Sequence, residues 1–425
     1  MSEPGTQEDV FVGREREVQE LNRYLEEALT GRGQISFVTG EAGSGKTVLV
    51  RQFIHQAFAS DPDLVAAVGT CNAQTGIGDP YLPFREALTM LTGGPTAGKA
   101  ADKTAPGGVS RLQGILRRSV QVLVEVAPDL VGVLVPGAGL VGSLGKAMAQ
   151  KAGWMDKLDE LVEKREGLSA EQERVFEQYT AFVQRLSTEV PLILFLDDLQ
   201  WADKASISLL FHLGRHVQNS RILILGAYRP NDVALGRGGE RHPLGPVVHE
   251  LTRYYGDVFV DLDGIPEAVN QQFVEALLDA QRSCLEDAFR QSLFHHTGGH
   301  ALFTVELIRA MQERGDLVRD EQERWVQGPS LDWSALPARV EGVIEERISR
   351  LDQDLREMLT IASVEGEEFT AEVVAQVQGM PTREAIQQLS GELDRQHRLV
   401  RGLDSLRLGT QRLSQYRFRH ILFQL

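Results

Sequence analysis

A glycine-rich stretch near the N-terminus has the composition of a phosphate-binding loop. Residues 40–47 read GEAGSGKT, which matches the pattern G-x-x-x-x-G-K-[ST]. Glycines let the backbone curl so that successive N–H groups point at phosphate oxygens, and the positive end of the following helix strengthens this attraction. Lys46 would reach the β- and γ-phosphates, and the Thr47 hydroxyl would bind Mg²⁺. The residues that we expect to line the nucleotide cradle are Gly40, Gly43, Ser44, Gly45, Lys46, Thr47 and Val48.

Two adjacent carboxylates, Asp197 and Asp198, follow the apolar run Leu192–Leu196. A rigid strand can carry one acid to the Mg²⁺ shell while the neighbouring acid orients or deprotonates an attacking water. We assign the metal role to Asp197 and the base role to Asp198. An apolar run that ends in two acids is also a common strand-to-turn signal, and the phosphate loop in the same chain favours the catalytic interpretation.

Arg229 follows a second apolar run, Leu225–Tyr228, and would lie at the edge of a sheet where ligands of open α/β folds bind. It would either sense the γ-phosphate or form a surface salt bridge, and both interpretations stay open. Asp79 and Asp203 are more typical of a turn former and a helix cap, so they are left out of the catalytic set. The chain has no Asn-Lys-x-Asp signature, which favours adenine over guanine as the base.

Three histidines and a cysteine in the second half of the chain could be drawn as a metal cluster. They are His295, His296, His300 and Cys284. Their spacing matches no zinc pattern, and histidines near a helix end are more often exposed or hydrogen-bonded. We predict no metal other than Mg²⁺.

The elements around the candidate site alternate between helix and strand. Helical spacing of apolar residues indicates helices at Glu15–Ala28, Thr47–Ala59 and Ser206–Val217. Short apolar runs indicate strands at Ile35–Val38, Leu64–Val68, Leu192–Leu196 and Arg221–Tyr228. Apolar strands separated by helices predict an α/β fold with a parallel sheet covered on both faces.

We expect three domains in the chain. Residues 1–240 would form the α/β domain, with a helical and flexible insertion near 93–187 that is rich in Gly, Ala, Thr and Pro at its start. Residues 241–335 would form a helical domain. Its clearest helices are Glu267–Leu278, Cys284–Phe294 and Phe303–Arg314.

Residues 336–425 would form the third domain. It begins with a long amphipathic helix, Val340–Ile361, and two shorter helices follow near Thr370–Val377 and Thr382–His397. It closes with β-like runs near Leu399–Leu403 and Tyr416–Phe418. Three helices followed by a hairpin are typical of a winged helix. The chain stops within an expected helix, so we expect a longer parent protein.

The overall composition narrows the classes of partner. With 42% hydrophobic and 24% charged residues, the chain has the composition of a folded globular protein. Its 44 basic and 60 acidic residues give a net charge of −16, which disfavours nucleic acid as the main partner. The start of the chain has no signal-peptide character and there are two cysteines, so we expect a cytoplasmic protein. The longest uncharged run, residues 130–145, falls short of the roughly 20 residues that cross a bilayer.

Several motifs together resemble the signal-transducing STAND ATPases within the wider AAA-like P-loop group, in particular the NTPase core of large ATP-binding LuxR-type regulators. Besides GEAGSGKT, the resemblance rests on FVGRERE at residues 11–17 and FLDDLQWAD at 195–203. GEAGSGKT resembles the family's Walker A loop, and FLDDLQWAD resembles its extended Walker B strand. GDPYLPFREAL at residues 78–88 also resembles a segment of the family. The match spans nearly the whole chain.

The resemblance implies further nucleotide contacts. The FVGRERE motif lies against the adenine in such proteins, which implies binding roles for Val12, Gly13 and Arg14. A helical lid carries a Gly-x-Pro motif near the base, and here TGGHALF at residues 297–303 has Ala301 in place of the proline. The winged-helix module often contributes a histidine that contacts the phosphates, and His420 in YRFRH is the matching residue.

As a function, the resemblance implies a switch that binds ATP or ADP with Mg²⁺ and hydrolyses ATP slowly. The nucleotide state would control opening and self-association, and thereby an effector or transcription. The activating signal, the effector and the oligomer number cannot be derived from the sequence.

Two alternatives belong to other classes. One is a P-loop phosphotransferase that acts on a small substrate, which the third domain disfavours. The other is a DNA-binding ATPase that uses the winged helix, although the net charge of −16 favours a solvated or intramolecular face for its basic residues. These residues are Arg395, Arg398, Arg401, Arg407, Arg412, Arg417 and Arg419.

Overall fold

The computed structural model describes residues 13–72, 80–92, 118–127, 130, 168–235 and 241–419, except 265, 330, 334, 336, 404, 409 and 410. The described residues form two compact units. The first, here the sheet unit, comprises Arg16–Gly40 and Lys46–Leu262. The second, here the C-terminal unit, comprises Asp263–Leu425 together with Glu41–Gly45 and Met1–Glu15, as far as these segments are described.

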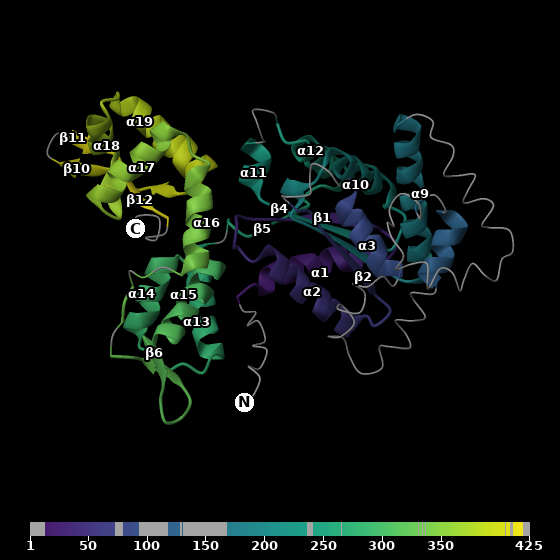
Figure 1. Cartoon of the computed structure of the whole chain (residues 1–425), viewed down its shortest axis with the longest axis horizontal. Helices are drawn as coiled ribbons and strands as arrows, with labels where there is room; N and C mark the ends of the chain where they lie inside the picture. Colours follow the sequence, from purple (N-terminus) through teal and green to yellow (C-terminus); the bar gives the residue numbers. More distant parts are fainter. Residues whose placement is uncertain are drawn as a thin grey trace. The chain divides into compact units, whose positions relative to one another are not determined.

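A parallel sheet of five strands organises the sheet unit (Figure 1). In spatial order the strands are β2 (Val65–Thr70), β3 (Leu192–Asp197), β4 (Ile222–Tyr228), β1 (Gln34–Thr39) and β5 (Phe259–Asp261). β4 pairs with both β1 and β3, so it lies between them. Because all five strands run in the same direction, their carboxyl ends share one edge. The predicted parallel sheet is confirmed, and with β5 it extends past residue 240, the expected end of the first domain.

Helices cover both faces of this sheet. They are α1 (Glu15–Leu29), α2 (Lys46–Ser60), α3 (Leu82–Thr92), α9 (Leu168–Glu189), α10 (Lys204–His216), α11 (Pro230–Leu235) and α12 (Leu244–Tyr255). Figure 1 shows α1 and α2 on one face and α10 and α12 on the other. α10 packs against α3, α9 and α12. A short helical segment at 118–126 is also described, whereas most of the predicted insertion lies outside the described residues.

The burial of the central strands explains why the sequence folds this way. Every residue of β3 and β4 is buried, which matches the continuous apolar runs expected for strands covered on both faces. Phe37, Leu194 and Ile224 belong to one core with residues of α9 and α10. Burial of each such side chain contributes about 1.5–3 kcal/mol, so the central strands form a rigid support for the residues at their ends.

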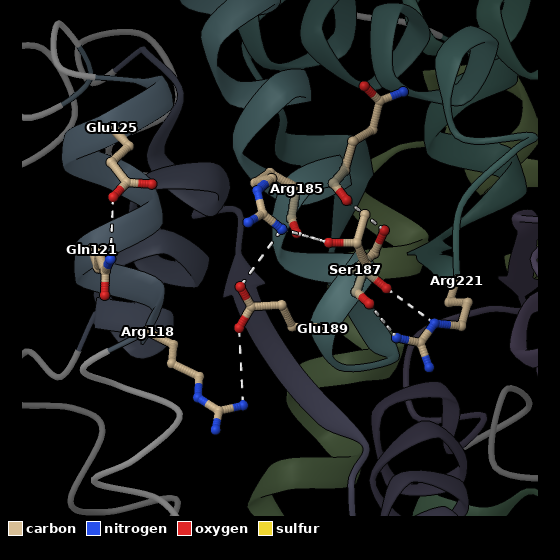
Figure 2. Close-up of polar contacts among 9 residues, drawn as sticks. Arg118, Gln121, Glu125, Arg185, Ser187, Glu189 and Arg221 are labelled. Atoms are coloured by element: carbon tan, nitrogen blue, oxygen red, sulfur yellow. Dashed lines mark hydrogen bonds and ion pairs between the residues drawn. The ribbon is translucent and has the colours of Figure 1, made fainter.

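The C-terminal end of α9 is fixed by polar contacts beside the start of β4 (Figure 2). The guanidinium of Arg221 donates to the carbonyl oxygens of Ser187 and Thr188, at 3.0 and 2.8 Å. These carbonyls belong to the last turn of α9, where they have no partner within the helix and carry partial negative charge. Arg185 and Arg118 approach the Glu189 carboxylate at 3.6 and 3.9 Å. The contacts of Arg221, which directly precedes β4, therefore anchor the end of α9 to the sheet.

The C-terminal unit begins with three helices and a hairpin. The helices are α13 (Glu267–Ala280), α14 (Asp287–Thr297) and α15 (Ala301–Arg314), and the hairpin strands are β6 (Leu317–Arg319) and β7 (Trp325–Gln327). All three predicted helices are present. α14 begins later than predicted, because the backbone N–H of Cys284 donates to the carbonyl of Trp325 and is held outside the helix.

The predicted single helix Val340–Ile361 is wrong. The structure has α16 (Ala338–Ser349) and α17 (Gln353–Glu365) in its place. The side chain of Asp352 accepts a hydrogen bond from the backbone N–H of Leu355 at 2.8 Å, which caps the start of α17. Apolar residues continue at helical spacing through the break, so the periodicity alone conceals it.

The rest of the unit contains a small antiparallel sheet with the strand order β8-β12-β9. The remaining elements are β8 (Glu368–Thr370), α18 (Ala371–Gln378), α19 (Thr382–Gln388), a π-helix at Leu389–Gln396, β9 (Val400–Gly402), β10 (Leu406–Leu408), β11 (Gln411–Leu413) and β12 (Gln415–Phe418). β9 and β12 pair, as expected for the two β-like runs, and β8 adds a strand that the sequence did not indicate. The winged-helix assignment stays a prediction, and so does the division into three domains.

Across the part of the chain that the structure describes, no helix has both the length and the apolar character that crossing a bilayer would require.

Candidate nucleotide-binding site

The glycine-rich loop connects the end of β1 to the start of α2. Gly43 and Gly45 have φ values of 78° and 94°, in the left-handed region that strains residues with a side chain. A Cβ atom at Gly43 would also lie 2.6 Å from the Cβ of Leu302, so the backbone leaves no room for one. The backbone N–H of Ser44 donates to the carbonyl of Glu41 at 3.2 Å and tightens the curl. Glycine is therefore required at both positions for this loop shape.

Lys46 and Thr47 open α2 directly after the loop, in the sheet unit. Lys46 is buried, and its Nζ donates to the carbonyl of Gly40, the residue that directly follows β1, at 2.7 Å. The Thr47 Oγ1 donates to Asp197 Oδ2 at 2.8 Å. The structure thus brings together the two residues predicted to hold Mg²⁺, one from the start of α2 and one from the end of β3.

The two neighbouring carboxylates have different surroundings. Asp197 is the last residue of β3 and is buried, and its Oδ1 accepts the backbone N–H of Asp198 at 3.0 Å. Burial raises the pKa of the Asp197 carboxyl, and the hydrogen bond from Thr47 partly opposes this shift. Asp198 has left-handed backbone angles, φ 56° and ψ 42°, which turn the chain away from the strand. Its Oδ1 accepts a hydrogen bond from Gln200 Nε2 at 2.8 Å.

The donor set suits a nucleotide with Mg²⁺. The Ser44 Oγ is buried and has no hydrogen-bond partner among the described residues, as expected of a hydroxyl that receives a ligand oxygen. The Thr47 hydroxyl and the Asp197 carboxylate are oxygen ligands, which Mg²⁺ prefers and uses in small number together with substrate phosphates. Among the described residues, no group of three His, Cys, Asp or Glu side chains could hold a metal without such help.

Arg229 lies at the carboxyl end of β4, between the ends of β1 and β3. Its guanidinium is 3.9 Å from Asp232 Oδ2, and both side chains are less than one-fifth exposed, at 17% and 12%. The salt bridge that the sequence left open is therefore present, while the sensor role is untested. The preceding residue, Tyr228, is buried beside Asp261, and burial with this charge raises the pKa of its hydroxyl to about 12.

Other predicted site residues are more scattered. Val12, Asp79 and His420 lie outside the described residues. The backbone N–H of Gly13 donates to Glu15 Oε1 at 3.2 Å, Arg14 is half-buried, and Val48 is 44% exposed. Asp203 caps α10 by accepting from the N–H groups of Ala205 and Ser206, which is the structural role the sequence favoured.

The stretch predicted to be the lid motif, residues 297–303, contacts the glycine-rich loop within the C-terminal unit. The backbone N–H of Leu302, at the start of α15, donates to the carbonyl of Gly43 at 3.1 Å. Gly298 and Gly299 have φ values of 57° and 72°, so the chain turns sharply between α14 and α15. The predicted position of this stretch beside the adenine is untested.

A buried charge cluster that the sequence did not indicate joins the same loop to α16. Arg347 Nη2 lies 3.5 Å from Glu41 Oε2, and the two side chains are 9% and 6% exposed. The backbone N–H of Glu41 donates to Asp263 Oδ2 at 2.9 Å, and Arg398 Nη1 lies 3.1 Å from the same oxygen. Burial lowers the pKa of Arg347, and the charges of Glu41 and Asp263 oppose that shift. No local pattern announces these contacts, because the partners are far apart in the sequence.

Further basic residues of the C-terminal unit also pair with acids. Arg401 and Arg417 both approach Glu267, at 3.4 and 3.6 Å. Arg419 Nη2 lies 2.7 Å from Asp394 Oδ1. These arginines thus neutralise acids of their own unit.

Comparison with protein families identifies the fold of this site. The model of the AAA ATPase domain matches residues 10–225, just over half of the chain, and spans both the glycine-rich loop and the strand that ends in Asp197. The chain belongs to this family. As an AAA ATPase domain, the chain has a P-loop nucleotide-binding fold, and the matched range contains both GEAGSGKT and FLDD. No curated protein matches the chain.

Several solved P-loop ATPases are similar to this AAA ATPase chain. The ORC1 protein of Aeropyrum pernix, solved in complex with DNA, is 16% identical, with 98% of this chain and 92% of that chain covered and a TM-score of 0.39. A STAND protein with a tetratricopeptide repeat sensor from Pyrococcus horikoshii is 14% identical, with 99% and 42% covered and a TM-score of 0.34. A Walker-type ATPase of Pyrococcus abyssi is 12% identical, with 99% and 96% covered and a TM-score of 0.43.

Proposed function

We propose that this AAA ATPase chain is a signalling switch that binds Mg–ATP, hydrolyses it slowly and changes its assembly with the nucleotide state. The hydrogen bond from Thr47 Oγ1 to Asp197 Oδ2, at 2.8 Å, carries the nucleotide part of this proposal. It joins the Walker A helix to the Walker B strand through the two side chains that would share Mg²⁺.

Each residue at the sheet edge has a role in the proposed hydrolysis. Lys46 would bind the β- and γ-phosphates by leaving the carbonyl of Gly40, and Thr47 with Asp197 would hold Mg²⁺, which neutralises charge on the phosphate oxygens. Asp198 would accept a proton from the attacking water, because its carboxylate lies directly after the strand end. Arg229 would exchange Asp232 for the γ-phosphate.

The regulatory part of the proposal is supported by the contacts of the loop segment Glu41–Gly45 within the C-terminal unit. Leu302 holds the carbonyl of Gly43, and Arg347 approaches the Glu41 carboxylate. A loop that rearranges around a nucleotide must alter these contacts, so the nucleotide state would change the stability of the C-terminal unit. We propose ADP as the resting ligand, self-association with ATP as the response, and His420 as a further phosphate contact.

The two other functions have less support. Four of the seven arginines expected for DNA contact pair with Asp263, Glu267 or Asp394, so more than half of that charge is used inside the unit. No described feature favours a small phosphate acceptor as substrate.

The test is to identify the nucleotide released when the purified full chain is denatured, and then to follow self-association by light scattering with ADP and with ATP. Retained ADP, and assembly that requires ATP, are expected for the switch. An empty site together with fast multiple turnover and no assembly would overturn the regulatory proposal while leaving the nucleotide site intact.

A further inference from the structure

Gln200 is a buried polar residue to which the proposed mechanism has so far given no role. It lies in a single turn of 3-10 helix, Leu199–Trp201, directly after Asp198, and its exposed fraction is 1%. Burial of a primary amide costs free energy unless both of its ends are hydrogen-bonded.

The Gln200 carboxamide bridges two proposed catalytic residues. Its Nε2 donates to Asp198 Oδ1 at 2.8 Å, and its Oε1 accepts the backbone N–H of Arg229 at 3.2 Å. The carboxylate can only accept and the backbone N–H can only donate, so the amide has one favourable orientation. A single side chain thus links the end of β3 to the end of β4.

The backbone of Gln200 is held as firmly as its side chain. Its carbonyl oxygen lies 3.0 Å from Nε2 of the buried His242. The backbone N–H of Leu244 donates to His242 Nδ1 at 3.2 Å, so Nδ1 is an acceptor and Nε2 carries the proton that is donated to Gln200. The N–H of Trp201 donates to the carbonyl of Asp198 at 2.9 Å and closes the turn. The amide therefore has little freedom to leave Asp198.

We infer that Gln200 is a positioning residue for hydrolysis. Its N–H group holds one oxygen of Asp198, which leaves the other oxygen to take the proton from water. Its carbonyl oxygen fixes the backbone of Arg229 relative to that base, so the base and the arginine keep a constant spacing. This inference rests on the proposed role of Asp198.

The sharpest variant is Gln200→Glu, because it keeps the size of the side chain and the oxygen that accepts from Arg229 but replaces the donor to Asp198 by a carboxylate oxygen. We expect kcat to fall by about 10- to 100-fold while the affinity for Mg–ATP stays within about twofold. Gln200→Met removes both hydrogen bonds without adding charge and should also lower kcat, with the affinity for Mg–ATP retained.

Gln184→Glu is a matched control, because the Gln184 side chain also donates one hydrogen bond, to the carbonyl of His216, but far along α9 from the sheet edge that carries Asp198. It should leave both kcat and the affinity for Mg–ATP unchanged. Parental kcat in folded Gln200→Glu would overturn the inference. If Gln200→Glu does not fold by circular dichroism, Gln200→Met decides the question by its kcat alone.

A double-mutant cycle separates this inference from the function on which it rests. Because Gln200 acts through Asp198, Gln200→Met should cost no further activity in an Asp198→Asn background. A full additional loss in that background would overturn the positioning role. Parental turnover by Asp198→Asn alone would overturn the proposed base, and the inference with it.

Discussion

Two charged regions of this chain are built in opposite ways. At the edge of the five-stranded sheet, Asp197 is 4% exposed and is held by the short hydroxyl of Thr47. In the C-terminal unit, Glu267 is 57% exposed and is approached by the long side chains of Arg401 and Arg417. The first region fixes a few oxygens on rigid strands, and the second balances charge at a solvated surface.

The difference indicates which charged residues are suited to chemistry and which only balance charge at the surface. A buried carboxylate is sensitive to every neighbour, because the low dielectric strengthens each interaction. An exposed ion pair contributes about 0–1 kcal/mol and is screened by salt. The buried pair of Glu41 and Arg347 lies in the C-terminal unit yet has the burial of the sheet edge, so it should behave like the first region.

The largest effect is expected for Asp198→Asn, which keeps the shape of the residue and removes the proton acceptor. We expect kcat to fall by about 10²- to 10⁴-fold with Mg–ATP affinity almost unchanged. Steady-state phosphate release together with a binding titration checks this. Asp203→Asn, at the cap of α10, is the control acid and should retain turnover, at some cost in stability. A normal rate in Asp198→Asn would place the base elsewhere.

The next effect concerns stability. Arg347→Met removes one partner of a buried ion pair with Glu41, so the free energy of unfolding should fall by about 3–5 kcal/mol. Urea unfolding without nucleotide measures it. Arg309→Met breaks an exposed pair with Glu313 and should cost less than about 1 kcal/mol. Equal costs for the two variants would mean that burial does not distinguish the regions.

A smaller effect of opposite sign is expected for Asp197→Asn. Burial raises the pKa of Asp197 in the folded chain, so ionisation of this group costs stability as the pH rises through its folded pKa. The neutral amide of Asp197→Asn should therefore raise the Tm of the nucleotide-free chain at pH 7. This increase in Tm over the parent should become smaller at low pH. Mg²⁺-dependent hydrolysis should be lost. Differential scanning calorimetry between pH 4 and 8 measures this. A lower Tm at every pH would contradict the assignment of burial as the dominant influence.

The smallest effect is expected for Glu267→Gln at the solvated surface. It removes the acid that Arg401 and Arg417 share and should change the free energy of unfolding by less than about 1 kcal/mol, with the difference vanishing in high salt. Urea unfolding at two ionic strengths tests it. A loss above 2 kcal/mol that persists in high salt would show that this face is not merely solvated.

The sequence could predict the sheet edge but not the contacts that tie it to other elements. GEAGSGKT and FLDD carry their chemistry in consecutive residues, and apolar runs as uniform as Leu192–Leu196 indicate buried strands directly. Gln200 contacts Arg229, and Glu41 contacts Arg347. In both pairs the two residues come from distant segments of the chain, and no local pattern encodes such contacts. The helix break at Asp352 was missed for a related reason, since apolar spacing continues through a cap whose hydrogen bond only the fold reveals.

The central claim is that the loop before α2 binds a nucleotide through Lys46, and a titration of Mg–ATP against the parent chain and Lys46→Ala tests it most directly. Because the substitution removes the buried side-chain cation of the phosphate cradle, affinity should fall by at least about 100-fold, roughly 2.7 kcal/mol. Lys204→Ala, which removes an exposed lysine at the start of α10, should bind like the parent. Equal affinities of Lys46→Ala and the parent would contradict the account of the site.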